Sequence, residues 1–104
     1  MIEKTYKFAP TETKMMEKIV VDENVNIAYV VLPPGEEVPP HYSNANVYMT
    51  VLKGTLSITL GEQDEADYES GTIVNFPDKT LMGAKNKADE NLELFVVKSP
   101  APTN

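Results

Sequence analysis

The sequence predicts an all-β fold, either a sandwich or a barrel, and three observations support this prediction. Roughly eight short runs are rich in β-branched and aromatic residues, as strands are. Glycine, proline or acidic turn segments separate them at intervals of about eight to twelve residues. No segment has the pattern of a long helix. The 104 residues fit a single domain.

The first third of the chain predicts three strands. Residues 1–10 alternate loosely, which predicts a short edge strand, and residues 14–22 favour a strand over a short helix because 19–21 are β-branched. Residues 25–32 predict a stronger strand, which the prolines at 33–34 end because proline cannot donate to a ladder. One face of that strand carries Val25, Ile27, Tyr29 and Val31.

The second half of the chain continues the pattern. Residues 46–53 and 55–60 predict two strands, and Lys53–Gly54 between them predicts a tight hairpin. The acidic stretch 61–70 predicts a solvated hairpin tip, because charge runs usually face water. Gly35 and Gly71 predict turns with positive φ. The last two predicted strands are residues 72–76 and 92–97.

Composition excludes several classes of function. The net charge is −7 and the chain has no arginine, so nucleic acid is a poor partner. The absence of cysteine excludes disulfides, thiolate zinc sites and cysteine nucleophiles. The charged N-terminus does not have the form of a signal peptide, and no segment is long and apolar enough to span a membrane, so we expect a cytoplasmic protein.

Two stretches of the chain have a recognisable spacing. Gly35 is followed after five residues by His41, and the stretch ends at Gly54. Gly71 is followed after five residues by Pro77, and the second stretch ends at Asn86. Together these six residues resemble the two sequence motifs of the cupin superfamily, over about residues 25–98. The resemblance implies a double-stranded β-helix, a jelly-roll barrel of two packed antiparallel sheets. We also expect the side chain of Asn86 to cap a turn.

The metal site that the resemblance implies is degraded. Cupin motifs supply three histidines and a glutamate, and the matching positions here hold His41, Ser43, Val47 and Met82. A divalent cation needs several anionic or imidazole donors that converge on one point. One histidine, a hydroxyl and a thioether fall short of that, although a copper(I) ion bound by His41 and Met82 is conceivable. We therefore expect no metal and no cofactor.

Strand periodicity then predicts the lining of the barrel. If His41 points inward, Ser43, Val47 and Met49 share its face. These four residues and Met82 are the predicted ligand-binding residues, and Tyr42 and Tyr48 fall on the outer face. The leading hypothesis is a binding domain for an unknown small organic molecule. The alternative is a cupin enzyme of the isomerase or epimerase, dioxygenase or decarboxylase class. It would use His41, with or without an atypically bound metal, and Tyr29 as an acid.

A third hypothesis is a purely structural domain with a filled barrel. The predicted organisation is one domain with three parts: an N-terminal arm over 1–24, the barrel over 25–98 and a flexible tail over 99–104. Because small members of the superfamily are often homodimers, the resemblance implies a homodimer. Residues 2–21 are the expected place of the partner contact.

Overall fold

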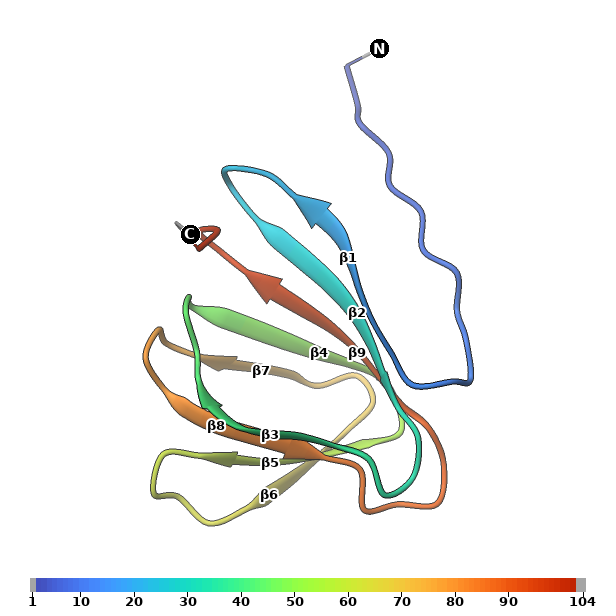
Figure 1. Ribbon diagram of the computed structural model, residues 1–104, viewed down its shortest axis with the longest axis vertical. Coiled ribbons are helices and arrows are strands. Elements are labelled where there is room, and N and C mark those ends of the chain that lie inside the picture. The colour runs from blue at the N-terminus through green and yellow to red at the C-terminus, as the bar shows by residue number, and fades with distance from the viewer. Residues whose placement is uncertain (1, 103–104) are drawn as a thin grey trace.

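Nine strands form two antiparallel sheets in the computed structural model, which describes residues 2–102 (Figure 1). One sheet has five strands in the order β1-β2-β9-β4-β7, and the other has four in the order β3-β8-β5-β6. No helix occurs in this range, so the predicted all-β fold of two sheets is confirmed. The strands are β1 (Met15–Val21), β2 (Asn26–Leu32), β3 (Glu37–Tyr42), β4 (Val47–Lys53), β5 (Thr55–Leu60), β6 (Ala66–Glu69), β7 (Ile73–Phe76), β8 (Leu81–Lys85) and β9 (Leu92–Lys98).

The core lies between the inner faces of the two sheets. It is formed by alternate residues of the strands, because successive side chains of a strand point to opposite faces. Burial of these apolar side chains removes them from water and is the main favourable contribution to folding. The core residues are Val30, Leu32, Val47, Met49, Val51, Leu56, Ile58, Val74, Phe76, Met82, Ala84, Leu92 and Leu94.

Six predicted strands are confirmed as β1, β2, β4, β5, β7 and β9, and three further strands lack a clear strand pattern. β3 contains Pro39 and Pro40, and it tolerates them because it is an edge strand whose register shifts between Val38 and His41. β6 lies within the acidic stretch that was predicted to be a solvated hairpin tip, and it pairs with β5. β8 carries Gly83 in its centre.

The predicted hairpin at Lys53–Gly54 is wrong. β4 pairs with β7 and β9, whereas β5 pairs with β6 and β8, so the chain crosses from one sheet to the other at this point. Gly54 has φ of 82°, and a Cβ atom built there would lie 2.4 Å from the carbonyl oxygen of Asn91. Only glycine fits this crossing without displacing the backbone of the 86–91 loop.

The predicted edge strand within residues 1–10 is also wrong for the described part, 2–10, which forms no strand. This segment runs past the outer face of the five-stranded sheet (Figure 1). The ring of Phe8 lies 4.9 Å from that of Tyr29 and 5.0 Å from that of Phe95, measured between centroids. Aromatic packing therefore positions the segment, and no backbone ladder is needed.

Two smaller predictions are confirmed. Gly35 and Gly71 have φ of 83° and 91°. The side chain of Asn86 is buried and caps the turn that follows it, because its Oδ1 accepts the backbone N–H of Ala88 at 3.0 Å. Its Nδ2 donates to the carbonyl oxygens of Leu32 and Glu90 and so holds two loops together.

Candidate ligand-binding site

A cavity of about 390 Å³ opens between the two sheets. Its apolar lining comes from both of them, and the core packing described above stops short of filling it. A volume of this size falls within the usual range for small-molecule sites, about 300–1,000 Å³. The apolar residues that line it are Met16, Val21, Ile27, Ala28, Val30, Val38, Val47, Met49, Met82, Ala84, Leu94, Val96 and Pro102.

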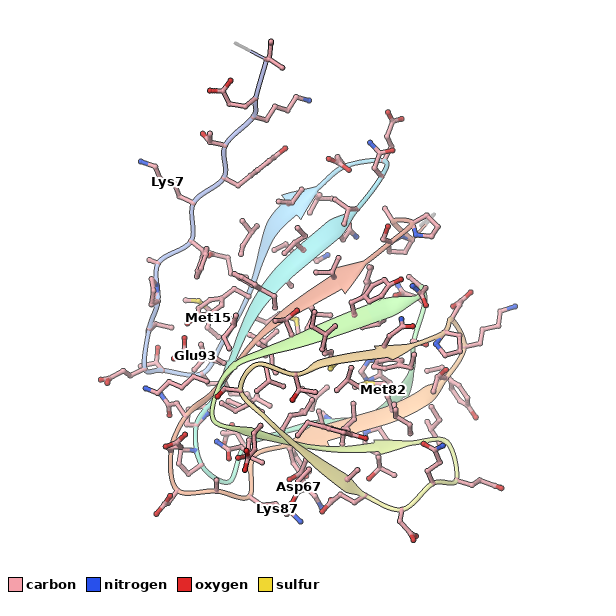
Figure 2. The ribbon with its side chains drawn as sticks, turned by 180° about the vertical axis from the view of Figure 1, so that it is seen from behind. Lys7, Met15, Asp67, Met82, Lys87 and Glu93 are labelled. Carbon is pink, nitrogen blue, oxygen red and sulfur yellow. The ribbon has the colours of Figure 1, made fainter. Side chains whose placement is uncertain are left out.

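The strand register explains why these residues share the cavity. His41 lies opposite Met82 across β3 and β8, and directly opposed residues of antiparallel strands point to the same face. In the other sheet Val47 lies opposite Lys98, and Met49 lies opposite Val96. The two sheets thus bring these inward positions together, and Met82 is buried on β8 (Figure 2).

All five predicted binding residues line this cavity: His41, Ser43, Val47, Met49 and Met82. Val47, Met49 and Met82 are buried and offer apolar contact. The imidazole of His41 is exposed at the mouth, and its Nδ1 lies 3.0 Å from the carbonyl oxygen of Pro39. The structure places the outer-face residues Tyr42 and Tyr48 in contact with solvent, as predicted.

The hydroxyl of Ser43 already forms two hydrogen bonds within the protein. Its Oγ donates to the carbonyl oxygen of Pro77 and accepts the backbone N–H of Thr80, both at 2.9 Å. Backbone hydrogen bonds with Lys79 and Thr80 add to this connection between the β3–β4 and β7–β8 loops. Ser43 therefore fixes the wall of the cavity and has little capacity left for a guest.

Two inward-facing lysines line the cavity, and sequence reasoning missed both. Lys98 on β9 donates from Nζ to Oδ1 of Asn44 at 2.8 Å, and Lys18 projects from β1. Burial, followed by the neighbouring charge of Lys18, lowers the pKa of Lys98. Neither ammonium group forms an ion pair with a carboxylate among residues 2–102.

Three other polar residues share this end of the cavity: Asp22, Asn26 and Asn44. Oδ1 of Asp22 accepts the backbone N–H groups of Val25 and Asn24, and these hydrogen bonds lower the pKa of the carboxyl. Oδ1 of Asn26 is buried and finds no hydrogen-bond partner within the described chain. The cavity therefore has an apolar floor and a polar mouth in which positive charge predominates.

Tyr29 does not belong to the cavity, so its suggested role as an acid beside His41 is wrong. Its side chain is fully buried on the opposite face of β2, under Phe8. Its hydroxyl donates to Oε1 of Glu93 at 2.5 Å, beside the N-terminal segment (Figure 2). Burial and this hydrogen bond raise the pKa of Tyr29. The sequence pattern placed the residue on one face of the strand but did not tell which face was inner.

The donors in the barrel do not fit a divalent metal. Among residues 2–102, no three histidine or carboxylate side chains lie together in a metal-binding arrangement. Around His41 the cupin ligand positions supply Met82, Val47 and a Ser43 hydroxyl that is already hydrogen-bonded. The two lysine ammonium groups on the same cavity would repel a cation further.

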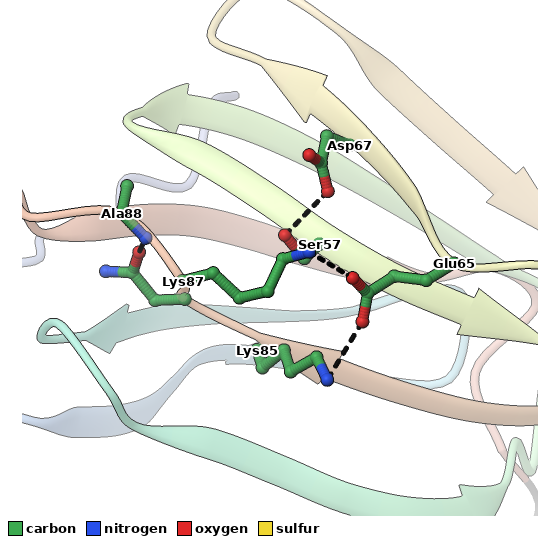
Figure 3. A network of polar contacts seen from close by, with 7 residues as sticks. Ser57, Glu65, Asp67, Lys85, Lys87 and Ala88 are labelled. Atoms are coloured by element: carbon green, nitrogen blue, oxygen red, sulfur yellow. Dashed lines mark hydrogen bonds and ion pairs between the residues drawn. The ribbon is translucent and has the colours of Figure 1, made fainter.

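A separate polar network lies on the four-stranded sheet (Figure 3). Glu65 pairs with Lys85 at 2.9 Å and with Lys87, and these lysines lower the pKa of its carboxyl. The Oγ of Ser57 donates to Oδ1 of Asp67 at 2.7 Å. None of these residues lines the 390 Å³ cavity, so the network connects strands and loops and is not part of the site.

Comparison with known proteins identifies the fold and its relatives. Residues 28–98 match the family described as Cupin domain. An uncharacterised protein of Methanocaldococcus jannaschii is 44% identical over 103 residues, which cover 98% of this chain and 89% of that protein. A crystal structure from the same organism, described as an RmlC-like cupin family protein with a double-stranded β-helix fold, superposes with a TM-score of 0.93. That match, also 44% identical, covers 98% of this chain and 94% of that one.

More distant structures share the fold alone. A cupin superfamily protein of Desulfitobacterium hafniense is 15% identical, with a TM-score of 0.75 and coverage of 89% and 83% of the two chains. The DMSP lyase DddQ of Ruegeria pomeroyi is 17% identical, with a TM-score of 0.68, and the match covers 75% of this chain and 39% of the lyase. Across residues 2–102, the structure contains no helix capable of crossing a membrane.

Proposed function

The chain belongs to the cupin superfamily, and we propose that its barrel binds a small organic molecule without the help of a metal ion. The observation that carries this proposal is the unfilled cavity of about 390 Å³ between the sheets. Its floor is apolar and its mouth carries a few polar groups, which is the usual composition of a small-molecule site. Met49 and Met82 add adaptable apolar contact.

Thermal-shift measurements with sugars, keto acids and aromatic acids test this proposal. Binding stabilises the native state, by about 2.7 kcal/mol when the ligand is at a hundred times its dissociation constant. Ala28→Leu narrows the cavity and is expected to weaken the shift, whereas Ala9→Leu, which lies outside the cavity, should preserve it. The cavity of about 390 Å³ already contradicts a filled barrel. If no compound raises the melting temperature of the unaltered protein, a purely structural role replaces this proposal.

Metal content is measured on the same protein, purified without chelator. We expect first-row metals far below one per chain, because the donor set around His41 cannot replace the hydration of a cation. A near-stoichiometric metal that is lost in His41→Ala would overturn the metal-free proposal.

A catalytic function is the second candidate, and one observation favours it. His41 shares the cavity with other titratable groups, Lys18 and Lys98, which an isomerase-type proton transfer requires. His41→Ala separates the two candidates once a guest is found. Catalysis predicts loss of turnover with binding retained, whereas a binding domain shows no turnover before or after the substitution.

A homodimer is the proposed assembly. Ile2 and Tyr6 on the N-terminal segment are both exposed. Apolar side chains exposed together on one part of a molecule are typical of protein interfaces. A second copy of the chain is the partner that the cupin relationship favours.

A further inference from the structure

We propose that the guest is a small apolar carboxylic acid, whose carboxylate binds Lys98 and Lys18 at the mouth while its apolar part lies on the floor of the cavity. This inference rests on the proposed binding function and specifies the chemical class of the ligand. The apolar floor consists of side chains such as Met49, Met82 and Val96.

The register makes both lysines face inward. Lys98 continues the inward alternation of β9 after Leu92, Leu94 and Val96. Lys18 lies opposite Ala28, which itself lies opposite Val96 across β2 and β9. The two lysine side chains therefore project from the inner face of the same sheet. Lys18 is level with Val96, and Lys98 lies two residues further along β9.

Protection of a sheet edge against pairing with other chains does not account for Lys98. Inward-pointing charges on edge strands discourage pairing with other chains, and that function is available to Lys18 because β1 is an edge strand. β9, however, lies between β2 and β4 in the centre of the sheet. A charge on a central strand that faces an apolar cavity costs stability, so a binding function is the better explanation.

The charge at the mouth lacks a counter-ion in the described chain. Its sequence has 16 acidic residues and nine lysines, yet neither Lys18 nor Lys98 pairs with a carboxylate within residues 2–102. Among residues 2–102, Asp22 is the one carboxylate that lines the cavity, and two backbone N–H groups donate to its Oδ1. The lowered pKa of Lys98 agrees with an ammonium group that has lost water without gaining an anion.

The rest of the mouth suits a carboxylate. Asn44 already accepts a hydrogen bond from Lys98, so a bound carboxylate would join an existing polar contact. Ammonium groups are strongly hydrated point charges that bind anions without the fork geometry of arginine. The apolar floor offers no hydrogen bonds to the hydroxyl groups of a sugar, which disfavours phosphorylated sugars.

Isothermal titration calorimetry tests the inference with matched acid and amide pairs: 3-phenylpropanoate against 3-phenylpropanamide, and hexanoate against hexanamide. We expect at least one acid to bind about tenfold more tightly than its amide or better, because hydrogen bonds to charged groups are the stronger ones. Lys98→Met should remove this preference and leave the amide affinity within about twofold. Lys53→Met, at an exposed lysine outside the cavity, should leave the preference unchanged.

The outcomes separate the two proposals. An amide that binds as tightly as its acid, or an acid preference that survives in Lys98→Met, overturns the carboxylate inference but supports binding in the barrel. If no acid and no amide of the two pairs binds, the carboxylate inference is wrong. The proposed binding function is also wrong only if no compound of the thermal-shift panel binds. Circular dichroism of each variant shows that a lost preference does not reflect loss of the fold.

Discussion

Lys98 carries its positive charge into a cavity with an apolar floor, and no carboxylate in the described chain forms an ion pair with it. Because burial lowers its pKa below the ordinary value of 10.5, the folded protein binds this proton less tightly than the unfolded chain does. The free energy of unfolding therefore decreases as the pH falls from 10.5 through the lowered pKa. At pH values below both pKa values, the full penalty is present.

Lys98→Met should accordingly stabilise the ligand-free protein at pH 7. We expect a gain of about 0.5–1 kcal/mol, at the lower end for single stabilising substitutions because Lys98 keeps part of its solvent contact. The gain should shrink as the pH is raised towards 10.5. Urea denaturation at several pH values measures it, with Lys53→Met as the exposed control. A variant less stable than the original protein at pH 7 would contradict this account of Lys98.

The sequence already contained a residue-scale indication of this lysine. Leu92, Leu94 and Val96 alternate inward, and Lys98 is the next position of the same face. His41 and Met82 were found because the motif spacing singles them out, whereas neither lysine belongs to a motif. The outer position of Tyr29 could not be foreseen, because both faces of β2 are apolar. Phe8, which covers the outer face, comes from the N-terminal segment, which is distant in sequence.

Individual strands were more predictable than their partners. Runs with β-branched residues such as Asn26–Leu32 identify a strand locally, but the register with β9 depends on residues sixty or more positions away. β3 and β8 escaped prediction because prolines and a glycine interrupt them, and β6 because acidic residues make up half of it. At Gly54 a turn within one sheet and a crossing between two sheets have the same local sequence.

Gly54→Ala tests that crossing. We expect the free energy of unfolding to fall by about 2–4 kcal/mol. A positive φ is unfavourable for alanine, and its Cβ would also lie 2.4 Å from the carbonyl oxygen of Asn91. Gly35→Ala is the matched control, since its φ of 83° is nearly the same but no atom lies within 4 Å of its Cβ. Chemical denaturation of both variants isolates the steric contribution. Equal losses at the two positions would show that the contact with Asn91 is unimportant.

At the scale of the whole molecule, the N-terminal segment is attached by a few contacts and otherwise projects from the barrel (Figure 1). Phe8 packs on the sheet, and the carbonyl oxygen of Glu12 accepts a hydrogen bond from Asn91 at 3.1 Å. Beyond Phe8, Tyr6 and Ile2 remain exposed. A segment of this kind is explained most simply by a second subunit that covers its apolar side chains.

Size-exclusion chromatography with light scattering should therefore report a dimer. The double variant Ile2→Ser/Tyr6→Ser should weaken it at least about tenfold, because burial of one large apolar side chain contributes roughly 1.5–3 kcal/mol. Ile73→Ser, at an exposed position on the opposite edge strand β7, is the control and should leave the dimer intact. A protein that is monomeric at all concentrations would refute the assembly.

The contact between Asn44 and Lys98 has a practical consequence. Asn44 is exposed at the entrance of the cavity, and the natural chain contains no cysteine. A single thiol introduced at this position would be the sole target for a maleimide dye. A fluorophore attached there would experience every change in the surroundings of the lysine, so emission intensity could be followed while compound libraries are screened in microplates.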